Sequence, residues 1–276
     1  MEHSNLFDLE PHGPDTFVGI GPRYPWGGLF GGQIVAQALR AAAATVDADQ
    51  QVHSLRAYFI RRGDHTEPIR FEVDRIRNGR SFSTRRVVAR QAIGAILNLE
   101  ASFHASEATA DVQTVPMDLS VPGPDALISD AWSEAFDRRS VPSSQLSNEL
   151  RTGTGRSAAW MRVVADLTEI PTGEQLLHRC WMAYMSDDMP SDTVRAAHPD
   201  FSEAEGHGIT YTASLDHTIW FHRPFRADEW HLYDFSCHGF TGARGLGIGH
   251  VFTVNGTHVA TVAQEVLMRD ARERQD

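Results

Sequence analysis

The chain has 276 residues and a formal net charge of −11, from 36 acidic residues and 25 basic residues that are all arginine. Because lysine is absent, the sequence excludes enzymes that form a Schiff base through a lysine amine, and it excludes the P-loop lysine. The acidic balance argues against nucleic acid as the main partner. Any anion that this protein binds must therefore be held by arginine, histidine or backbone N–H groups.

The sequence predicts a soluble globular protein of a reducing cytoplasm. A hydrophobic fraction of 41% is ordinary for such a protein, and the two cysteines, Cys180 and Cys237, lie too far apart to suggest a disulfide framework. Residues 1–5 are polar and begin no signal peptide, and the last three residues are not a peroxisomal signal.

The first half is predicted to be one helix followed by an antiparallel meander. Residues 30–46 are apolar and alanine-rich, with Gly31 and Gly32 at the start, which favours a buried helix. An Asn78-Gly79 pair predicts a tight hairpin. The expected strands cover 52–62, 68–77, 81–91 and 95–104.

Residues 106–156 are rich in Ser, Pro, Gly and Asp, and we interpret them as a connector with a short helix near 129–138. The second half again combines a helix with strands. Its expected elements are a strand over 158–168, a helix over 172–187 that begins at Thr172, and strands near 209–223, 229–238, 243–254 and 257–269. The predicted division is an N-terminal module over 1–105, the connector over 106–156 and a C-terminal module over 157–276.

The two halves share a spacing of 162 residues. It relates three pairs of like residues, which are Phe59 and Phe221, Arg61 and Arg223, and Gly94 and Gly256. With the shared order of helix and strands, this favours duplication of an α+β module over chance agreement. Each module would be one apolar helix wrapped by its own antiparallel sheet.

Several familiar motifs are absent, including His-Glu-x-x-His, paired Cys-x-x-Cys and Gly-x-Ser-x-Gly. One dinucleotide-binding near-match, at 153–158, precedes a strand instead of following one, so we interpret it as a loop. Gly245, Gly247 and Gly249 alternate on one face of a strand and indicate close approach by another backbone or a ligand.

Five segments resemble the acyl-CoA thioesterase II family over nearly the whole chain outside the connector. They cover residues 29–39, 52–64, 79–87, 215–225 and 262–265. The resemblance implies an α+β fold of the double hotdog type, with two helix-in-sheet modules in one chain. It also implies a homo-oligomer, a dimer or tetramer, that hydrolyses fatty acyl-CoA without a metal or organic cofactor.

The family holds its attacking water with an Asp, a Ser or Thr, and a Gln. Carried over to this sequence, these residues are Asp187, Ser214 and Gln264. Asp187 would act as the general base, and the other two would fix the water and the carboxylate. Without the resemblance, Asp187 would be interpreted as a helix cap and the other two as surface residues. The sequence departs from the family pattern at 188–190, directly after the aspartate.

We expect the substrate to bind at the helix start and at an arginine-rich segment. Gly31, Gly32 and Gln33 would place backbone N–H groups and the positive end of a helix dipole at the thioester carbonyl. Residues 56–90 contain ten arginines and four acids, a local charge of +6, which suits docking of the coenzyme A phosphates or a solvated sheet face. The candidate phosphate contacts are Arg61, Arg85 and Arg86.

Asp216 and His217 invite a catalytic interpretation because an acid adjoins an imidazole. Neighbours on a strand point to opposite faces, so we expect supporting roles for them. Two other functions remain open. A hotdog enoyl-CoA hydratase is less favoured because the sequence lacks Asp-x-Asn-Pro-x-x-His, and a non-catalytic acyl-CoA-binding protein would have no need of the trio.

Overall fold

The computed structural model describes residues 6–147, 153–165, 167, 175–198 and 210–270. The N-terminal half has the predicted helix and four-stranded meander, preceded by two short strands that were not predicted. The elements are β1 (Glu10–Pro11), β2 (Thr16–Gly19), α1 (Gly31–Ala43), β3 (Gln50–Phe59), β4 (Ile69–Asn78), β5 (Phe82–Gln91) and β6 (Gly94–Ala105). The Asn78-Gly79 hairpin is confirmed by the pairing of β4 with β5 and by a bond from the Gly79 N–H to the Phe82 carbonyl at 3.0 Å.

The predicted helix near 129–138 is wrong. Instead, β7 (Phe136–Ser140) pairs antiparallel with β8 (Thr154–Val163), and short 3-10 turns occur at Pro124–Ala126 and Ser143–Gln145. The 153–158 segment is also mostly strand and not a loop, since β8 begins at Thr154. The physical reason is the open edge of β8, whose unpaired backbone groups are satisfied when 136–140 extends along it.

The C-terminal half has its expected helix and strands, with two differences. These elements are α2 (Gln175–Ser186), α3 (Pro190–Ala197), β9 (Thr210–Ser214), β10 (Asp216–Phe221), β11 (His231–Thr241), β12 (Arg244–Thr253) and β13 (His258–Asp270). Helix α3 was not predicted, although Pro190 stands in its first turn, where proline is favoured. The strand expected over 209–223 is divided at Leu215, where the register with β13 shifts by one residue. Thr172, the predicted helix start, lies outside the described residues, as do residues 166, 168 and 209 at the ends of two expected strands.

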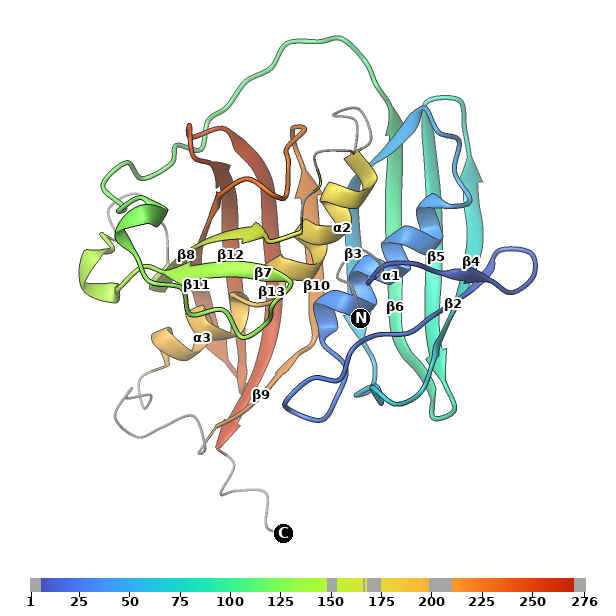
Figure 1. The fold of residues 1–276 in the computed structure, drawn as a ribbon, viewed down its shortest axis with the longest axis horizontal. Helices are drawn as coiled ribbons and strands as arrows, with labels where there is room; N and C mark the ends of the chain where they lie inside the picture. The colour runs from blue at the N-terminus through green and yellow to red at the C-terminus, as the bar shows by residue number, and fades with distance from the viewer. Residues whose placement is uncertain (1–5, 148–152, 166, 168–174, 199–209, 271–276) are drawn as a thin grey trace.

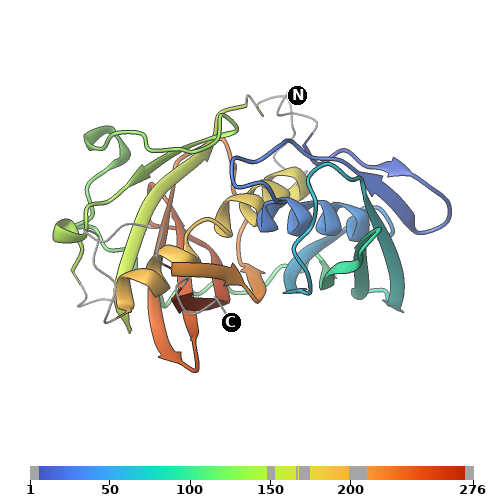
Figure 2. The same ribbon diagram turned by 90° about the horizontal axis from the view of Figure 1, so that it is seen from below.

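All the described strands form one antiparallel sheet that is bent around the helices. Its order is β1-β2-β4-β5-β6-β3-β10-β13-β12-β11-β8-β7, with β9 beside β13. The halves meet where β3 pairs with β10, and there Arg56 lies opposite Thr218. These two residues are themselves 162 apart, so a two-fold axis between the halves would pass through this seam. Figures 1 and 2 show one half on each side of it.

Helices α1 and α2 lie together on the inner side of the sheet and supply the centre of the hydrophobic core (Figure 2). Every α1 residue from Gly32 to Leu39 is buried, as the alanine-rich pattern predicts. The helices approach closely at Gly32, where a Cβ atom would overlap the carbonyl oxygen of Tyr184. No helix within the described ranges is both long and apolar enough to span a membrane.

A buried ion cluster fastens part of the connector to the second half of the sheet. The Arg156 guanidinium lies 2.8 Å from Asp118 in the connector and 2.8 Å from Asp234 on β11. All three side chains are almost fully excluded from solvent.

The three alternating glycines of β12 do accommodate close neighbours, but these are mainly side chains and not the backbone or ligand that the sequence predicts. A Cβ atom at Gly245 would overlap Val194 of α3, one at Gly247 would lie 3.0 Å from Thr193, and one at Gly249 would lie 2.5 Å from Phe235. Helix α3 therefore packs directly on the backbone of this strand.

Candidate active site

The candidate site lies where the end of α2 meets the start of α1. Asp187 follows the last residue of α2, and its Oδ2 accepts a hydrogen bond from the Gly32 backbone N–H at 2.8 Å. First-turn N–H groups of a helix have no partner within the helix and carry its positive dipole end, so they favour a carboxylate. The side chain of Asp187 is 4% exposed.

Ser214 and Gln264 come from two strands of the same half. Ser214 ends β9 and Gln264 lies in β13, and the Gln264 Nε2 donates to the Ser214 hydroxyl oxygen at 2.7 Å. Gln264 is 1% exposed. Both side chains lie near enough to the Asp187 carboxyl to lower its pKa, so the structure brings the three predicted residues together.

His217 on β10 supports this group from behind. One ring nitrogen, Nδ1, is hydrogen-bonded to Gln264 Oε1, and the other, Nε2, lies 2.9 Å from the Ser186 hydroxyl. Burial lowers the pKa of His217 to about 4, so the ring is neutral near pH 7. Since an amide oxygen only accepts, Nδ1 must carry the proton, and Ser186 then donates to Nε2.

The outcome for Asp216 and His217 agrees with their opposite orientations on the strand. Asp216 accepts a bond from the Glu265 N–H at 2.7 Å and pairs with Arg56 at the surface, whereas His217 is fully buried. The sequence predicts a supporting role for His217 but does not identify its hydrogen-bond partner. A fully buried histidine next to the seam was not recognisable from the strand pattern alone.

The Asp187 carboxyl has the electrostatic character of a general base. Burial raises its pKa to about 7, although the donors Gly32, Gln264 and Ser214 act in the opposite direction. Its second oxygen, Oδ1, is buried and has no hydrogen-bond partner of good geometry among the described residues. A carboxylate with a raised pKa and one unused oxygen is suited to accept a proton from a bound water.

Asp188, where the sequence departs from the family pattern, belongs to a separate polar cluster. Its carboxylate accepts a bond from the Trp132 Nε1–H at 2.6 Å and lies 3.0 Å from the Arg138 guanidinium. Burial raises its pKa, and the Arg138 charge lowers it. This cluster fixes the turn between α2 and α3 that orients Asp187.

Of the three predicted substrate-binding residues at the start of α1, Gly31 and Gly32 lie against Asp187 and the side chain of Gln33 does not. A Cβ atom at Gly31 would lie 2.6 Å from Asp187 Oδ2 and 2.9 Å from the ring of Phe59, so glycine is required for the carboxylate to approach. The N–H of Gly32 is already bonded to Asp187 and is not free for a substrate carbonyl. The side chain of Gln33 instead packs against Gly21 and donates to Gln37 at 3.2 Å, so it is occupied within the core.

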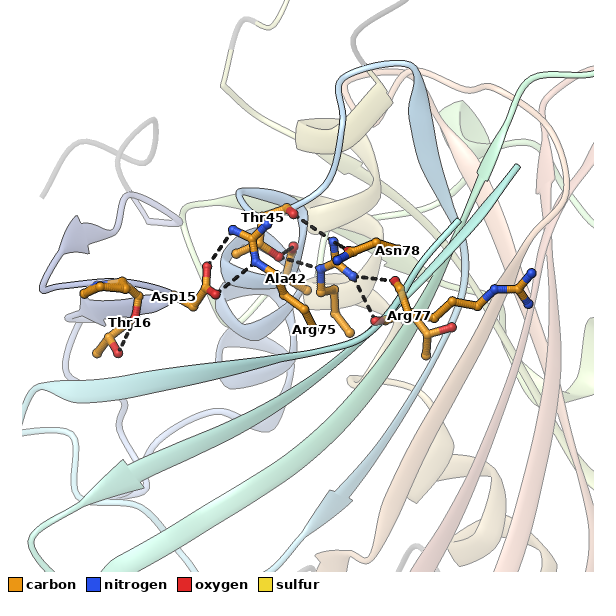
Figure 3. A network of polar contacts seen from close by, with 10 residues as sticks. Asp15, Thr16, Ala42, Thr45, Arg75, Arg77 and Asn78 are labelled. Atoms are coloured by element: carbon orange, nitrogen blue, oxygen red, sulfur yellow. Dashed lines mark hydrogen bonds and ion pairs between the residues drawn. The ribbon is translucent and has the colours of Figure 1, made fainter. Parts of the chain in front are cut away.

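The prediction that Arg85 contacts coenzyme A is wrong. Arg85 is 2% exposed, and its guanidinium donates to the Thr45 hydroxyl, the Thr45 carbonyl, the Arg77 carbonyl and the Asn78 side chain, all at 2.7–2.8 Å. Figure 3 shows these partners gathered between the end of α1 and the β4–β5 hairpin. Arg85 therefore ties the helix to the sheet.

Several arginines of the 56–90 segment form ion pairs with acidic side chains. Arg86 lies at the surface beside Asp74, Arg75 binds Asp15 at 2.8 Å, and Glu72 pairs with two further arginines. The exposed Arg61 donates to the Ala95 carbonyl at 2.8 Å. Phosphate contacts by Arg61 and Arg86 stay a prediction.

The fold defines the class of protein. A sheet wrapped around two helices within one chain is a double hotdog. The same fold occurs in a solved hot dog fold protein from Alicyclobacillus acidocaldarius, with a TM-score of 0.73 at 20% identity, covering 98% of each chain. Within the described residues, no group of His, Cys, Asp or Glu is arranged to hold a metal ion.

Sequence comparisons then identify the family. Residues 21–106 match the family model described as acyl-CoA thioesterase N-terminal domain, and residues 109–268 match the acyl-CoA thioesterase C-terminal domain. The mouse acyl-coenzyme A thioesterase 8 is 34% identical over 297 aligned residues, which cover 96% of this chain and 88% of the relative. The solved acyl-CoA thioesterase II TesB2 from Mycobacterium marinum is 36% identical, with a TM-score of 0.83 and full coverage of both chains. The chain belongs to the acyl-CoA thioesterase family.

Proposed function

We propose that this protein hydrolyses fatty acyl-CoA to a fatty acid and coenzyme A, with a water activated by Asp187. The observation that carries the proposal is the buried Asp187 carboxyl. One of its oxygens is bonded to the Gly32 N–H, and the other is unpartnered within the described structure beside Ser214 and Gln264. Family membership supports the thioester as the substrate.

The reaction needs one proton transfer and one addition to the carbonyl carbon. A water bonded to Asp187 Oδ1 and to the Ser214 hydroxyl gives a proton to the carboxylate as its oxygen attacks the thioester carbon. The C–S bond then breaks, the acid is released, and the proton passes from Asp187 to the coenzyme A thiolate. No acyl-enzyme is formed, so no strong nucleophile is required.

The oxyanion that develops on the carbonyl needs hydrogen-bond donors. Gly32 is committed to Asp187, so the remaining first-turn N–H groups of α1, at Gly31 and Gln33, are the donors that we assign to it. Their position at the positive end of α1 supports this assignment.

Gln264 is held in the orientation that the reaction requires. Because His217 donates to Gln264 Oε1, the amide nitrogen must face Ser214 and the water. We therefore place His217 as a positioning residue and not as a catalytic residue.

We further propose a homo-oligomer, a dimer or tetramer, in a reducing cytoplasm. Trp220 of β10 is 43% exposed and Leu246 of β12 is 38% exposed, and both line one open hollow of the sheet, while Tyr58 of β3 is 49% exposed. Exposed apolar side chains of this size favour association. Both cysteines are free thiols, which supports the compartment. Light scattering on the eluting peak of a size-exclusion column tests the assembly, and a monomer at micromolar concentration would contradict it.

The activity is tested by free-thiol release from acyl-CoA substrates of two to eighteen carbons. We expect saturable release with at least one chain length, and no addition of water to an enoyl-CoA double bond. If no thiol appears with any acyl chain, the proposed function is wrong.

A further inference from the structure

The ends of α1 and α2 remote from Asp187 form a second hollow. Asp187 lies at the end of α2 and the start of α1, whereas this cavity of about 670 Å³ lies at the end of α1 and the start of α2. Its walls include Ala44, Val52 and Leu177, and two arginines, Arg40 and Arg179, also line it. The volume is in the range of small-molecule sites.

This cavity is the counterpart of the candidate active site under the internal repeat. The spacing of 162 that relates Arg56 to Thr218 across the seam also relates Val52, in the cavity wall, to Ser214. In the sheet register, Leu55 takes the position of His217, and Ala101, which lies opposite Leu55 on β6, takes the position of Gln264. The second hollow therefore retains a place for a ligand but lacks the proposed hydrolytic groups.

Arg179 gives this hollow an unbalanced buried charge. It is 9% exposed, its Nη1 donates to the Val52 carbonyl at 2.7 Å, and its guanidinium lies 5.7 Å from the centre of the Phe221 ring. Its Nε is buried without a hydrogen-bond partner, and no acidic side chain of the described structure forms an ion pair with it. Burial lowers its pKa to about 10, so it stays charged at neutral pH. A buried cation that has no counter-ion among the described residues is costly, and a bound anion would relieve that cost.

We propose that this cavity binds the carboxylate of a medium-chain fatty acid, with Arg179 and Arg40 on the headgroup. Besides the arginines, the lining includes the polar Gln50, Gln51 and Gln175 and an apolar set that matches an alkyl chain, which is Ala43, Val46, Val52, Phe103, Leu176 and Leu177. Asp47 at the exposed rim disfavours a multiply charged phosphate.

The physiological meaning rests on the proposed function, since such a carboxylate is the product of the proposed reaction. A site for it at the other end of the helices would make the product an effector. The binding itself uses no residue of the Asp187 site.

Isothermal titration of the full-length protein with sodium octanoate tests the proposal. We expect saturable binding that Arg179→Met weakens at least tenfold and that Asp187→Asn leaves within twofold. Octanol, which lacks the charge, and inorganic phosphate, which lacks the chain, should each bind at least tenfold more weakly than octanoate.

Two further variants guard against misfolding and general charge effects. Ala44→Phe fills the cavity from an exposed position and should also weaken octanoate at least tenfold, whereas Arg70→Met, at an exposed ion pair on β4, should not change it. Unchanged binding in a folded Arg179→Met or in Ala44→Phe would overturn the proposal. Loss of binding only in Asp187→Asn would place octanoate in the active site and overturn it as well. If the protein binds octanoate but releases no thiol from any acyl-CoA, the proposed binding site is supported and the proposed thioesterase function is wrong.

Discussion

Two opposing influences set the pKa of the Asp187 carboxyl, and this pKa decides whether the group can accept a proton at neutral pH. Burial favours the protonated carboxylic acid, whereas the Gly32 N–H and the nearby Ser214 and Gln264 favour the carboxylate. The resulting pKa of about 7 leaves the group partly ionised at neutral pH, which suits a general base.

The first prediction is a pH dependence of kcat/KM. Only the ionised form of Asp187 can take a proton from water, so the rate should rise with pH through about 7 and level off above it. At pH 5 about 1% of the group is ionised, so we expect a rate about a hundredfold below the plateau. A flat profile between pH 5 and 8, with circular dichroism unchanged, would contradict this assignment.

The second prediction concerns His217. His217→Leu removes the donor to Gln264 Oε1 and should lower kcat about 10- to 100-fold with KM nearly unchanged, because the amide loses its fixed orientation. Asparagine places an N–H close to the position of Nδ1, so His217→Asn should recover much of kcat. Equal losses in both variants would assign His217 a purely structural role.

At the scale of elements, the contact between α1 and α2 depends on Gly32. A third prediction is that Gly32→Ala lowers the free energy of unfolding by about 2 kcal/mol or more, because the added methyl overlaps the Tyr184 carbonyl and forces the helices apart. Gly123→Ala is the control, since nothing lies within 4 Å of its Cβ position. Urea denaturation compares the two, and equal stabilities would show that the helices do not touch there.

The fourth prediction concerns the ion cluster that fastens the connector. Burial alone would raise the pKa of Asp118, but bonds from Ser120 and Arg156 bring it to about 2. Arg156→Met would leave Asp118 and Asp234 buried without their cation, at a cost of about 3–5 kcal/mol in urea denaturation. Arg86→Met removes an exposed ion pair and should cost about 1 kcal/mol or less. If both variants lose about 1 kcal/mol or less in the free energy of unfolding, the Arg156 cluster is solvated and not buried.

The sequence predicts best those elements that are stabilised by residues close to them in the chain. The α1 helix and the Asn78-Gly79 hairpin arise from neighbouring residues, and both are confirmed. The sequence does not predict strand β7 and favours a short helix there, because the strand is stabilised by the edge of β8, which is remote in sequence. Arg85 was expected at the surface because a strand pattern does not show that Thr45 and Asn78 converge on its guanidinium.

At the scale of the whole molecule, one sheet joins two related halves that have different roles. Only the family resemblance points to Asp187, Ser214 and Gln264, because no short motif links a residue just after α2 with residues on β9 and β13. The structure adds that Gly32 and His217 hold this trio in place. The opposite end of the helices has a hollow of its own, with Leu55 in the place of His217 and Ala101 in the place of Gln264.

The division of the chain at 105 and 156 stays a prediction. Residues 136–140 of the proposed connector join the sheet of the second half, and the C-terminal family model begins at residue 109. Both findings are compatible with a connector that is largely absorbed by the C-terminal module.

The central claim is that the Asp187 carboxylate activates the water that cleaves the thioester. The most direct test is the rate of coenzyme A release under saturating acyl-CoA by the parent protein and by Asp187→Asn, which preserves shape and acceptance from the Gly32 N–H but removes the base. We predict a loss of about 10²- to 10⁴-fold in kcat, with the variant still folded. Full activity in Asp187→Asn would contradict the account.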